Sequence, residues 1–463
     1  MKLLEDTITA IATPQGEGGI GIIRISGNMS INIAAKIFVS KKSIQEFLSH
    51  HLYYGAIINP SNNAPIDDCL LAVMKLPHSY TGEDIVEIYC HGGSLILKRV
   101  LEAVLKYGAR IAEPGEFTKR AFLNGRMDLL QAESVIDLIR AKTDLALNTA
   151  RSHLSGRLSK EISMIKEDLV HILCYIEAEL DFPEEEDVPR ISDNRIVEVI
   201  KKSETILDKL LSTYEEGRIL IDGLKVIIIG RTNVGKSSLL NCLLKEERAI
   251  VTPIPGTTRD IIEEVLNIRG IPVRLMDTAG IREPSDEVEG IGIRWTMDRL
   301  KKADMVLFII DVSGDNISDD LKLFKRVYND GKRLVIIFNK MDISKDSIVS
   351  DYQKVFSDYR IVKASALLED GIEELKDAIY GAVAKHEGEE IQEIIITSLR
   401  HKTALDRAVH GLKLAHETVE NNLSREFLAA EIKGALNAIG EIVGETTSDD
   451  ILERIFSQFC IGK

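Results

Sequence analysis

The residues of this chain best suited to chemistry lie in the segment 230–237, which reads Gly-Arg-Thr-Asn-Val-Gly-Lys-Ser. The spacing matches the phosphate-binding loop pattern G-x-x-x-x-G-K-[ST]. Its two glycines let the backbone turn tightly, so that N–H groups point at phosphate oxygens. Lys236 would reach the β- and γ-phosphates during catalysis, and Ser237 would offer its hydroxyl to Mg²⁺. The pattern therefore predicts a nucleoside triphosphate site.

The sequence on either side of this loop supplies the elements that the pattern needs. Residues 224–229 form an apolar, β-branched run that predicts a buried strand, and residues 238–244 predict the first turns of a helix. The N-terminus of that helix adds partial positive charge at the phosphates. The competing interpretation, a glycine-rich helix start that binds no ligand, is disfavoured by this strand–loop–helix order.

Two further segments follow predicted strands, and the second of them identifies the base. Asp277-Thr278-Ala279-Gly280 suits water-mediated Mg²⁺ binding and contact with the γ-phosphate, although a simple turn uses the same residue types. Asn339-Lys340-Met341-Asp342 follows the strand predicted at 334–338. A carboxylate at Asp342 can accept two parallel N–H bonds from guanine, and adenine offers no such pair. A backbone N–H in the segment 362–367 suits the guanine oxygen.

These elements, in this order, predict a GTP site, against the alternative that 339–342 is only a turn at a strand end. The residues predicted to contact GTP are Asn233, Val234, Gly235, Lys236, Ser237, Ser238, Thr252, Thr257, Thr258, Asp277, Thr278, Ala279, Gly280, Asn339, Lys340, Asp342, Ser365, Ala366 and Leu367.

The segment 250–260 contains two prolines and a glycine, and it predicts a loop that acts as the first switch. Thr258 in this loop is the predicted second Mg²⁺ ligand beside Ser237. Many signalling GTPases carry a water-orienting Gln directly after the Asp-x-x-Gly segment, where this chain has Ile281. An isoleucine cannot orient water, so the site must activate water by other means.

Length and composition limit the class of protein. A chain of 463 residues allows about three domains. Apolar runs such as 305–310 are too short to span a bilayer, and no signal region follows the first residues, which favours a cytoplasmic protein with no membrane contact. Five scattered cysteines without a C-x-x-C pair suggest neither disulfides nor zinc. The net charge of −15 favours nucleic-acid contact that is local, transient or delegated to a partner.

The order of predicted elements indicates a multidomain α/β protein. Residues 1–118 predict a compact α+β domain, with strands at 7–13, 21–26, 51–58, 68–74 and 84–90 and a helix at 94–107. Helical periodicity then runs from 117 to 214 with one clear interruption at 181–189, and it returns from 391. We therefore expect a helical domain, 119–218 and 385–463, into which a Ras-like P-loop G domain, 219–384, is inserted.

Five stretches of the chain closely resemble the bacterial tRNA-modification GTPase MnmE (TrmE) family. They are 12–27, 114–124, 253–260, 277–292 and the terminal Phe-Cys-Ile-Gly-Lys at 459–463. The resemblance covers essentially the whole chain. It implies a homodimer and an N-terminal domain that binds a tetrahydrofolate derivative, 5-formyl or 5,10-methylene.

The same resemblance implies a flavoprotein partner of the MnmG type, which would carry the FAD in a heterotetramer and provide most of the tRNA contact. Together the two proteins would add an aminomethyl or carboxymethylaminomethyl group at carbon 5 of the wobble uridine. The implied folate contacts are Arg24, Glu87, Arg126 and Lys463. Position 126 often holds Lys in this family, and Arg keeps the charge but changes the geometry. Without the resemblance, Arg24 would be interpreted as an exposed charge on a strand.

The resemblance also implies how water is activated. Asn233, Thr252, Ile254 and Thr257 would hold K⁺ through oxygen atoms, in place of an arginine finger. Glu289 matches the catalytic glutamate of the family, although its sequence context alone suggests a solvated acid. Cys460 matches a family cysteine and is a candidate redox or catalytic residue.

Two other classes of GTPase stay open at this point. A ribosome-assembly GTPase shares the nucleotide motifs but usually adds a basic RNA-binding module, and none is evident in this sequence. A metal-loading GTPase should show His- or Cys-rich tracts, which are also not evident.

Overall fold

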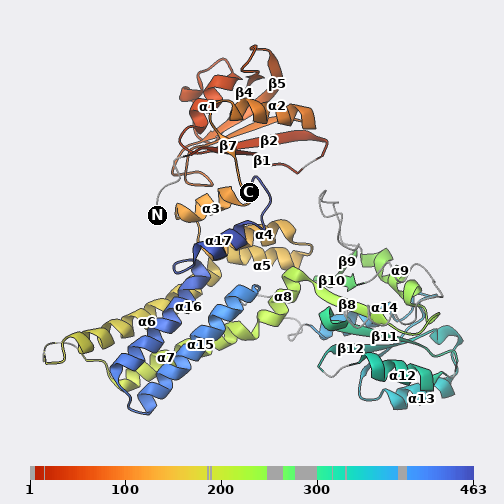
Figure 1. Ribbon diagram of the computed structural model, residues 1–463. Coiled ribbons are helices and arrows are strands. Elements are labelled where there is room, and N and C mark those ends of the chain that lie inside the picture. The colour runs from red at the N-terminus through yellow and green to blue at the C-terminus, as the bar shows by residue number, and fades with distance from the viewer. Residues whose placement is uncertain are drawn as a thin grey trace. The chain divides into compact units, whose positions relative to one another are not determined.

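The computed structural model describes residues 6–14, 16–184, 187, 190–247, 264–276, 300–314, 316–328, 331–383 and 394–463 (Figure 1). The chain forms two compact units. Unit 1 comprises 1–136, 153–196 and 417–463, and unit 2 comprises 137–152 and 197–416. The four domain boundaries expected from the sequence stay a prediction. Within the described ranges, no helix combines the length and apolar character needed to cross a membrane.

A seven-stranded sheet with the order β3-β4-β5-β6-β2-β1-β7 is the core of the N-terminal region in unit 1. Its strands are β1 (Ile8–Ile11), β2 (Gly18–Ser26), β3 (Phe38–Val39), β4 (His51–Ile58), β5 (Pro65–Met74), β6 (Ile85–Gly92) and β7 (Arg110–Ile111). All neighbours are antiparallel except β1 and β7. The predicted α+β region is therefore confirmed, although β2 and β5 begin earlier than expected.

Strand alternation gives this sheet two different faces. Ile23, Ile25 and Ile88 pack on the face that α1 (Ser30–Ile37) and α2 (Ser94–Leu105) cover (Figure 1). Arg24 and its cross-strand partner Glu87 point to the other face.

That second face is covered at one end and open at the other. Over β1, the residues Ile8 and Ala10 pack with Phe117 of α3 (Glu116–Leu123) and with Tyr80. On β4 and β5, by contrast, the same face carries exposed apolar side chains. They are Leu52, Tyr54 and Leu70, with exposed fractions of 58%, 69% and 40%. Arg24 and Glu87 lie between these two parts of the face, because they occupy β2 and β6.

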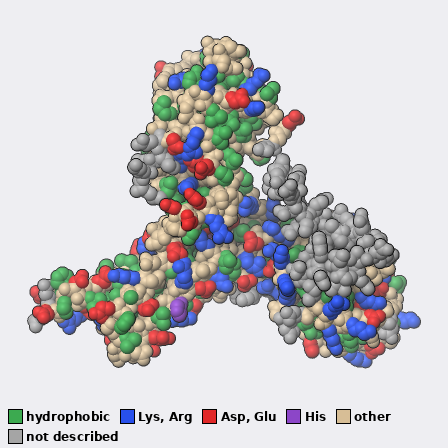
Figure 2. All heavy atoms as spheres, viewed as in Figure 1, with side chains coloured by type: hydrophobic (Ala, Val, Ile, Leu, Met, Phe, Trp, Pro, Cys, Tyr) green, Lys and Arg blue, Asp and Glu red, His purple; other side chains and the backbone are tan. Residues whose placement is uncertain are grey.

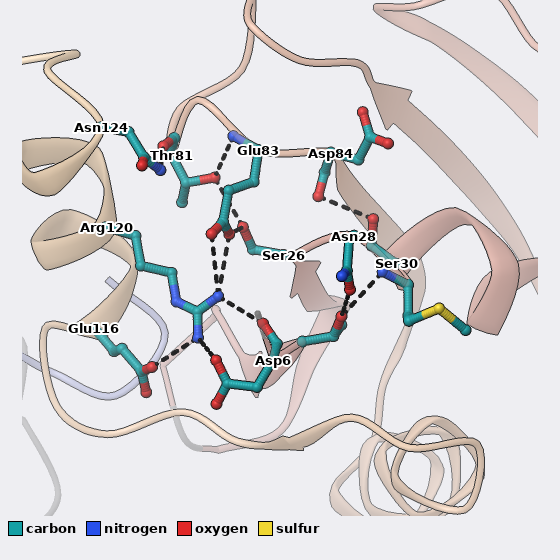
Figure 3. Close-up of polar contacts among 12 residues, drawn as sticks. Asp6, Ser26, Asn28, Ser30, Thr81, Glu83, Asp84, Glu116, Arg120 and Asn124 are labelled. Carbon is teal, nitrogen blue, oxygen red and sulfur yellow. Dashed lines mark hydrogen bonds and ion pairs between the residues drawn. The ribbon is translucent and has the colours of Figure 1, made fainter. Parts of the chain in front are cut away.

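A buried arginine holds the covered end together (Figure 3). The guanidinium of Arg120 on α3 is 1% exposed and contacts three carboxylates. Its NH1 and NH2 atoms lie 2.8 Å from Asp6 Oδ1, 3.2 Å from Glu83 Oε1 and 3.0 Å from Glu116 Oε1. Ser26 Oγ on β2 donates to Glu83 Oε2 at 2.7 Å. Arg120 thus joins α3 to the residues just before β1 and to the segment before β6, and Glu83 links that segment to β2.

These contacts alter the acidity of two of the carboxyl groups. Burial alone would raise the pKa of Asp6 and of Glu116, but hydrogen bonds from Arg110 and Arg120 outweigh it and lower both pKa values. A lowered folded-state pKa stabilises the fold above the unfolded pKa. That contribution is lost as the pH falls below about 4 toward the lowered values.

The helical region of the chain is more divided than its periodicity predicts. Before residue 214 the structure has α4 (Leu129–Arg140), α5 (Asp144–Leu154), α6 (Arg157–Asp181) and α7 (Asp193–Ser212). The prediction of a single interruption at 181–189 is therefore wrong. Gly125 and Gly156 adopt φ values of 68° and 78°, which end one helix before the next begins. Asp128 accepts from the Gln131 N–H at 2.8 Å and caps α4.

The predicted return to helices near the C-terminus is confirmed by α15 (Leu399–Glu420), α16 (Arg425–Val443) and α17 (Asp449–Phe456). In unit 1, α16 packs against α6 with an ion pair between Lys433 and Glu177. The last residues then reach α3, where the Gly115 N–H donates to the Cys460 carbonyl oxygen at 3.5 Å (Figure 1).

Unit 2 contains a six-stranded sheet with the order β13-β12-β11-β8-β10-β9. Its strands are β8 (Leu224–Ile229), β9 (Glu264–Ile268), β10 (Ile271–Met276), β11 (Met305–Asp311), β12 (Arg333–Asn339) and β13 (Arg360–Lys363). All pairs are parallel except β9 with β10. One face is covered by α9 (Lys236–Glu247) and α14 (Ile372–Gly381), and the other by α12 (Ile317–Val327) and α13 (Asp346–Val355) (Figure 1).

The chain enters and leaves this sheet at one place. α8 (Tyr214–Asp222) leads into β8, and Thr213 Oγ1 accepts from the Ile396 N–H at 3.0 Å. A Cβ on Gly217 would lie only 2.2 Å from the Ile396 carbonyl oxygen, so the two segments touch through backbone. Adjacent ends are what an inserted domain requires.

We predict that Glu116→Gln lowers the local stability of α3 and β1 by about 3 kcal/mol at pH 7, because it removes a buried charge partner of Arg120. Native-state hydrogen exchange of the amides in α3 and β1 measures this free energy. The difference from wild type should shrink below about pH 4, where the wild-type carboxyl also becomes protonated.

The control for this prediction is Glu102→Gln. Glu102 is 60% exposed and lies 4.0 Å from Lys98, so its loss should change stability by less than about 0.5 kcal/mol. Equal effects of the two variants would contradict a special role for the Arg120 cluster.

Candidate functional site

The loop between β8 and α9 has the backbone that the phosphate pattern requires. Asn233 and Gly235 adopt φ values of 62° and 99°, in the left-handed region where successive N–H groups can turn toward one point. A Cβ at Gly230 would lie 2.4 Å from the Ile309 carbonyl oxygen, and a Cβ at Gly235 would lie 2.2 Å from Asn339 Nδ2. Both glycines are therefore needed for close packing, and Gly235 is needed for the turn as well.

Lys236 lies across this loop. Its Nζ donates to the carbonyl oxygens of Gly230 at 2.9 Å and Arg231 at 2.6 Å. Burial lowers the pKa of Lys236 from its usual value. The ammonium group is thus held over the turn, where it would meet the β- and γ-phosphates of a nucleotide. Ser237 and Ser238 follow it in the first turn of α9.

Asn339, at the end of β12, connects the phosphate loop to the segment predicted to bind the base. Its Nδ2 donates to the Val234 carbonyl oxygen at 2.8 Å, and its Oδ1 accepts from the Ala366 N–H at 2.9 Å. The side chain is 2% exposed, so both bonds are shielded from water. Residues far apart in the sequence are thereby held as one surface.

Asp342 and Ser365 also come together in this surface. Ser365 Oγ donates to Asp342 Oδ1 at 2.6 Å, which leaves further acceptor positions on the carboxylate. Beyond Ser365, the predicted contact Leu367 is exposed.

One residue of this site, Asp311 at the end of β11, was not predicted from the sequence. The predicted contact Lys340 adopts φ 65°, and its Nζ lies 2.6 Å from Asp311 Oδ2. Asp311 and Asn339 are paired in the β11–β12 register. An acidic residue closing a buried strand, one strand away from the Asn-Lys-x-Asp segment, could have indicated this ion pair.

Several predicted GTP, K⁺ and catalytic residues lie outside the described residues. They are Thr252, Ile254, Thr257, Thr258, Asp277, Thr278, Ala279, Gly280 and Glu289. Their roles stay predictions.

A second candidate site lies on the partly covered face of the unit 1 sheet. Arg24 Nε donates to Glu87 Oε1 at 2.8 Å, and Arg24 NH1 donates to the Gly462 carbonyl oxygen at 3.1 Å. The guanidinium carbon of Arg24 lies 5.8 Å from the ring centre of Tyr80 and 5.6 Å from that of Phe117. Two strands, one helix and the C-terminus therefore meet around a single arginine.

Lys463 belongs to the same cluster. Burial lowers its pKa most, the positive charge of Arg24 lowers it further, and the Glu87 carboxylate opposes both effects. Arg24, Glu87 and Lys463 are thus brought together, as the predicted folate contacts require. The fourth predicted contact, Arg126, makes its hydrogen bond to a neighbouring loop. Its Nε donates to the carbonyl oxygen of Ser79, the residue before Tyr80. Cys460 is exposed.

The sequence interpretation missed the aromatic rings at this second site. Phe117 stands in the terminal part of the α+β region, next to the acidic start of α3, and Tyr80 lies in the loop before β6. Neither residue shows a periodic signal that would connect it to Arg24. Only the packing of α3 on β1 places both rings there.

Comparisons with known proteins cover nearly the whole chain. The family model described as "GTP-binding protein TrmE N-terminus" matches residues 7–126, and the one described as "MnmE helical domain" matches residues 129–460. A protein of Alkaliphilus oremlandii (strain OhILAs) named "tRNA modification GTPase MnmE" is 45% identical, over 99% of this chain and 100% of that protein. A protein of Syntrophus aciditrophicus (strain SB) with the same name is 46% identical, over 100% of both chains.

We predict that Asp342→Asn lowers GTP affinity by about 2–4 kcal/mol, because it removes a carboxylate that can accept two N–H bonds from guanine. Affinity for xanthosine triphosphate should rise, since that base offers an oxygen where guanine has its amine. Titration calorimetry with each nucleotide measures the two affinities. Unchanged GTP affinity would exclude Asp342 as the base-reading residue.

Proposed function

The chain belongs to the tRNA modification GTPase MnmE family and is a GTP-hydrolysing enzyme of tRNA modification, and we propose that it acts on the wobble uridine. GTP hydrolysis would serve the addition of an aminomethyl or carboxymethylaminomethyl group at carbon 5 of that base. The observation that supports this most is the full-length likeness to named tRNA modification GTPases. Family membership also decides against the ribosome-assembly and metal-loading alternatives.

We propose a cytoplasmic homodimer that works with a flavoprotein of the MnmG type, which would carry the FAD. The open part of the unit 1 sheet supports self-association, because Leu52, Tyr54 and Leu70 present apolar side chains next to the Arg24 cluster. A second copy covering this face would also shield the folate site from water.

Most of the tRNA contact would come through the partner. Lys and Arg side chains are interspersed with Asp and Glu side chains over the visible faces of both units (Figure 2). With a net charge of −15, such a surface gives little general attraction for a phosphate backbone.

A tetrahydrofolate derivative, 5-formyl or 5,10-methylene, would bind at Arg24, Glu87, Arg126 and Lys463. The donor set fits such a ligand: two cations, Arg24 and Lys463, suit its carboxylates, and the carboxylate of Glu87 suits the N–H groups of its ring. Bound there, the folate would supply the one-carbon unit.

At the nucleotide site, Ser237 and Thr258 would hold Mg²⁺. Asn233 with Thr252, Ile254 and Thr257 would hold K⁺, which would neutralise charge that develops on the phosphates. The left-handed backbone of Asn233 supports this role, since it places an amide side chain within the turn of the phosphate loop. Glu289 would polarise the attacking water, directly or through a second water.

We predict that GTP hydrolysis requires K⁺ and is slow in Na⁺, because Na⁺ is too small for a cage of carbonyl and amide oxygens. Glu289→Ala should leave GTP binding near normal and slow turnover roughly a hundredfold. Single-turnover hydrolysis in saturating K⁺ or Na⁺ measures both effects. Equal rates in the two salts, or an unchanged rate for the variant, would decide against this mechanism.

We also predict that deleting 460–463 separates the two sites. The deletion removes Lys463 and the Gly462 carbonyl that Arg24 contacts, but it leaves the phosphate loop and Asp342 intact. GTP hydrolysis should persist, while 5-formyl-tetrahydrofolate binding and wobble modification should fail. Mass mapping of the wobble uridine in a strain that lacks the endogenous enzyme, complemented with each form, tests the proposed function.

Full modification by the shortened protein would refute the placement of the folate site. Wild-type levels of the modified wobble uridine in the uncomplemented strain would refute the proposed reaction itself.

A further inference from the structure

Tyr89 makes a contact that neither the sequence motifs nor the predicted folate contacts include. It lies on β6 two residues after Glu87, so both side chains point to the same face of the sheet. Tyr89 Oη donates to Glu87 Oε2 at 2.6 Å. Arg24 holds the other carboxylate oxygen, Oε1, at 2.8 Å.

These two bonds fix the carboxylate of Glu87 from both sides. A carboxylate offers about four acceptor positions, two on each oxygen. Arg24 and Tyr89 each use one, so one position on each oxygen is left for a ligand. Two such positions in one plane match an edge that carries two parallel N–H donors, as the ring of a folate does.

We propose that Tyr89 is a positioning residue for ligand recognition at this site, which acts by holding the plane of the Glu87 carboxylate. This inference rests on the proposed folate-binding function. Without the hydroxyl, only Arg24 would restrain the carboxylate, and it could rotate away from the geometry that receives both N–H groups.

The environment keeps Tyr89 in the form this role needs. Burial and, after it, the hydrogen bond to Glu87 raise the pKa of Tyr89 to about 12. The phenol therefore stays protonated, and remains a donor, at neutral and moderately alkaline pH.

Tyr89→Phe tests the proposal, because it removes one hydroxyl and keeps the ring. We expect the affinity for 5-formyl-tetrahydrofolate to fall roughly five- to tenfold, as for loss of a bond to a charged group. GTP turnover and the thermal unfolding temperature should match those of wild type. Tyr107→Phe is the matched control, since Tyr107 packs beside Lys36 on the opposite, helix-covered face of the sheet, and this variant should bind the ligand normally.

A double-mutant cycle separates positioning from a merely structural role. In a Glu87→Gln background, titrated at millimolar ligand, Tyr89→Phe should cost less than about twofold, because the carboxylate that it orients is gone. An equal loss in both backgrounds, or wild-type affinity in Tyr89→Phe alone, would overturn the inference. No binding by the wild-type protein would instead overturn the proposed folate function.

Discussion

The buried guanidinium of Arg120 is the contact on which the second site depends most. Its three carboxylate partners come from the segment just before β1, the segment before β6 and its own helix (Figure 3). Removing such a charge from water is costly unless its partners are fixed, so each partner constrains the others. Through Glu83 the network fixes the loop that carries Tyr80, and through α3 it fixes Phe117, which lies one helical turn before Arg120. The Arg120 network therefore fixes the positions of the two rings, Tyr80 and Phe117, beside Arg24.

In unit 2, a neutral side chain connects separate segments of the chain, as Arg120 does in unit 1. Asn339 reaches the phosphate loop with its amide nitrogen and the base-binding segment with its amide oxygen. An amide can donate and accept at once, which an aspartate at neutral pH cannot do. The close packing of its nitrogen against Gly235 explains why that loop position tolerates no side chain. Phosphate and base recognition are therefore linked through a single buried residue.

Features that depend on neighbouring residues in the sequence could be predicted, whereas features that depend on distant residues meeting in the fold could not. The strand–loop–helix at 224–244 and the Asn-Lys-x-Asp segment are each one continuous run of residues, so the element and its role could be predicted together. The predicted fold class is confirmed. The Arg120 cluster could not be predicted, because Asp6, Glu83 and Glu116 each look like ordinary surface acids and meet only in the folded chain. The helix breaks at Gly125 and Gly156 were missed because an apolar stripe can continue across a short turn. Arg24 was identified only through its family resemblance.

The position of the last two residues, Gly462 and Lys463, depends on their packing against the N-terminal sheet of unit 1. Gly462 adopts φ 96°, and a Cβ there would lie 2.6 Å from the Ile11 carbonyl oxygen on β1. Any larger residue would push the terminus away from the sheet, so only glycine lets its carbonyl reach Arg24. Lys463 then stands beside Arg24 although their charges repel. Burial lowers the pKa of the lysine most, and the positive charge of Arg24 lowers it further. Two like charges kept together by Glu87 and by packing are a poor way to stabilise a fold. They are a good way to hold positive charge ready for an anionic ligand.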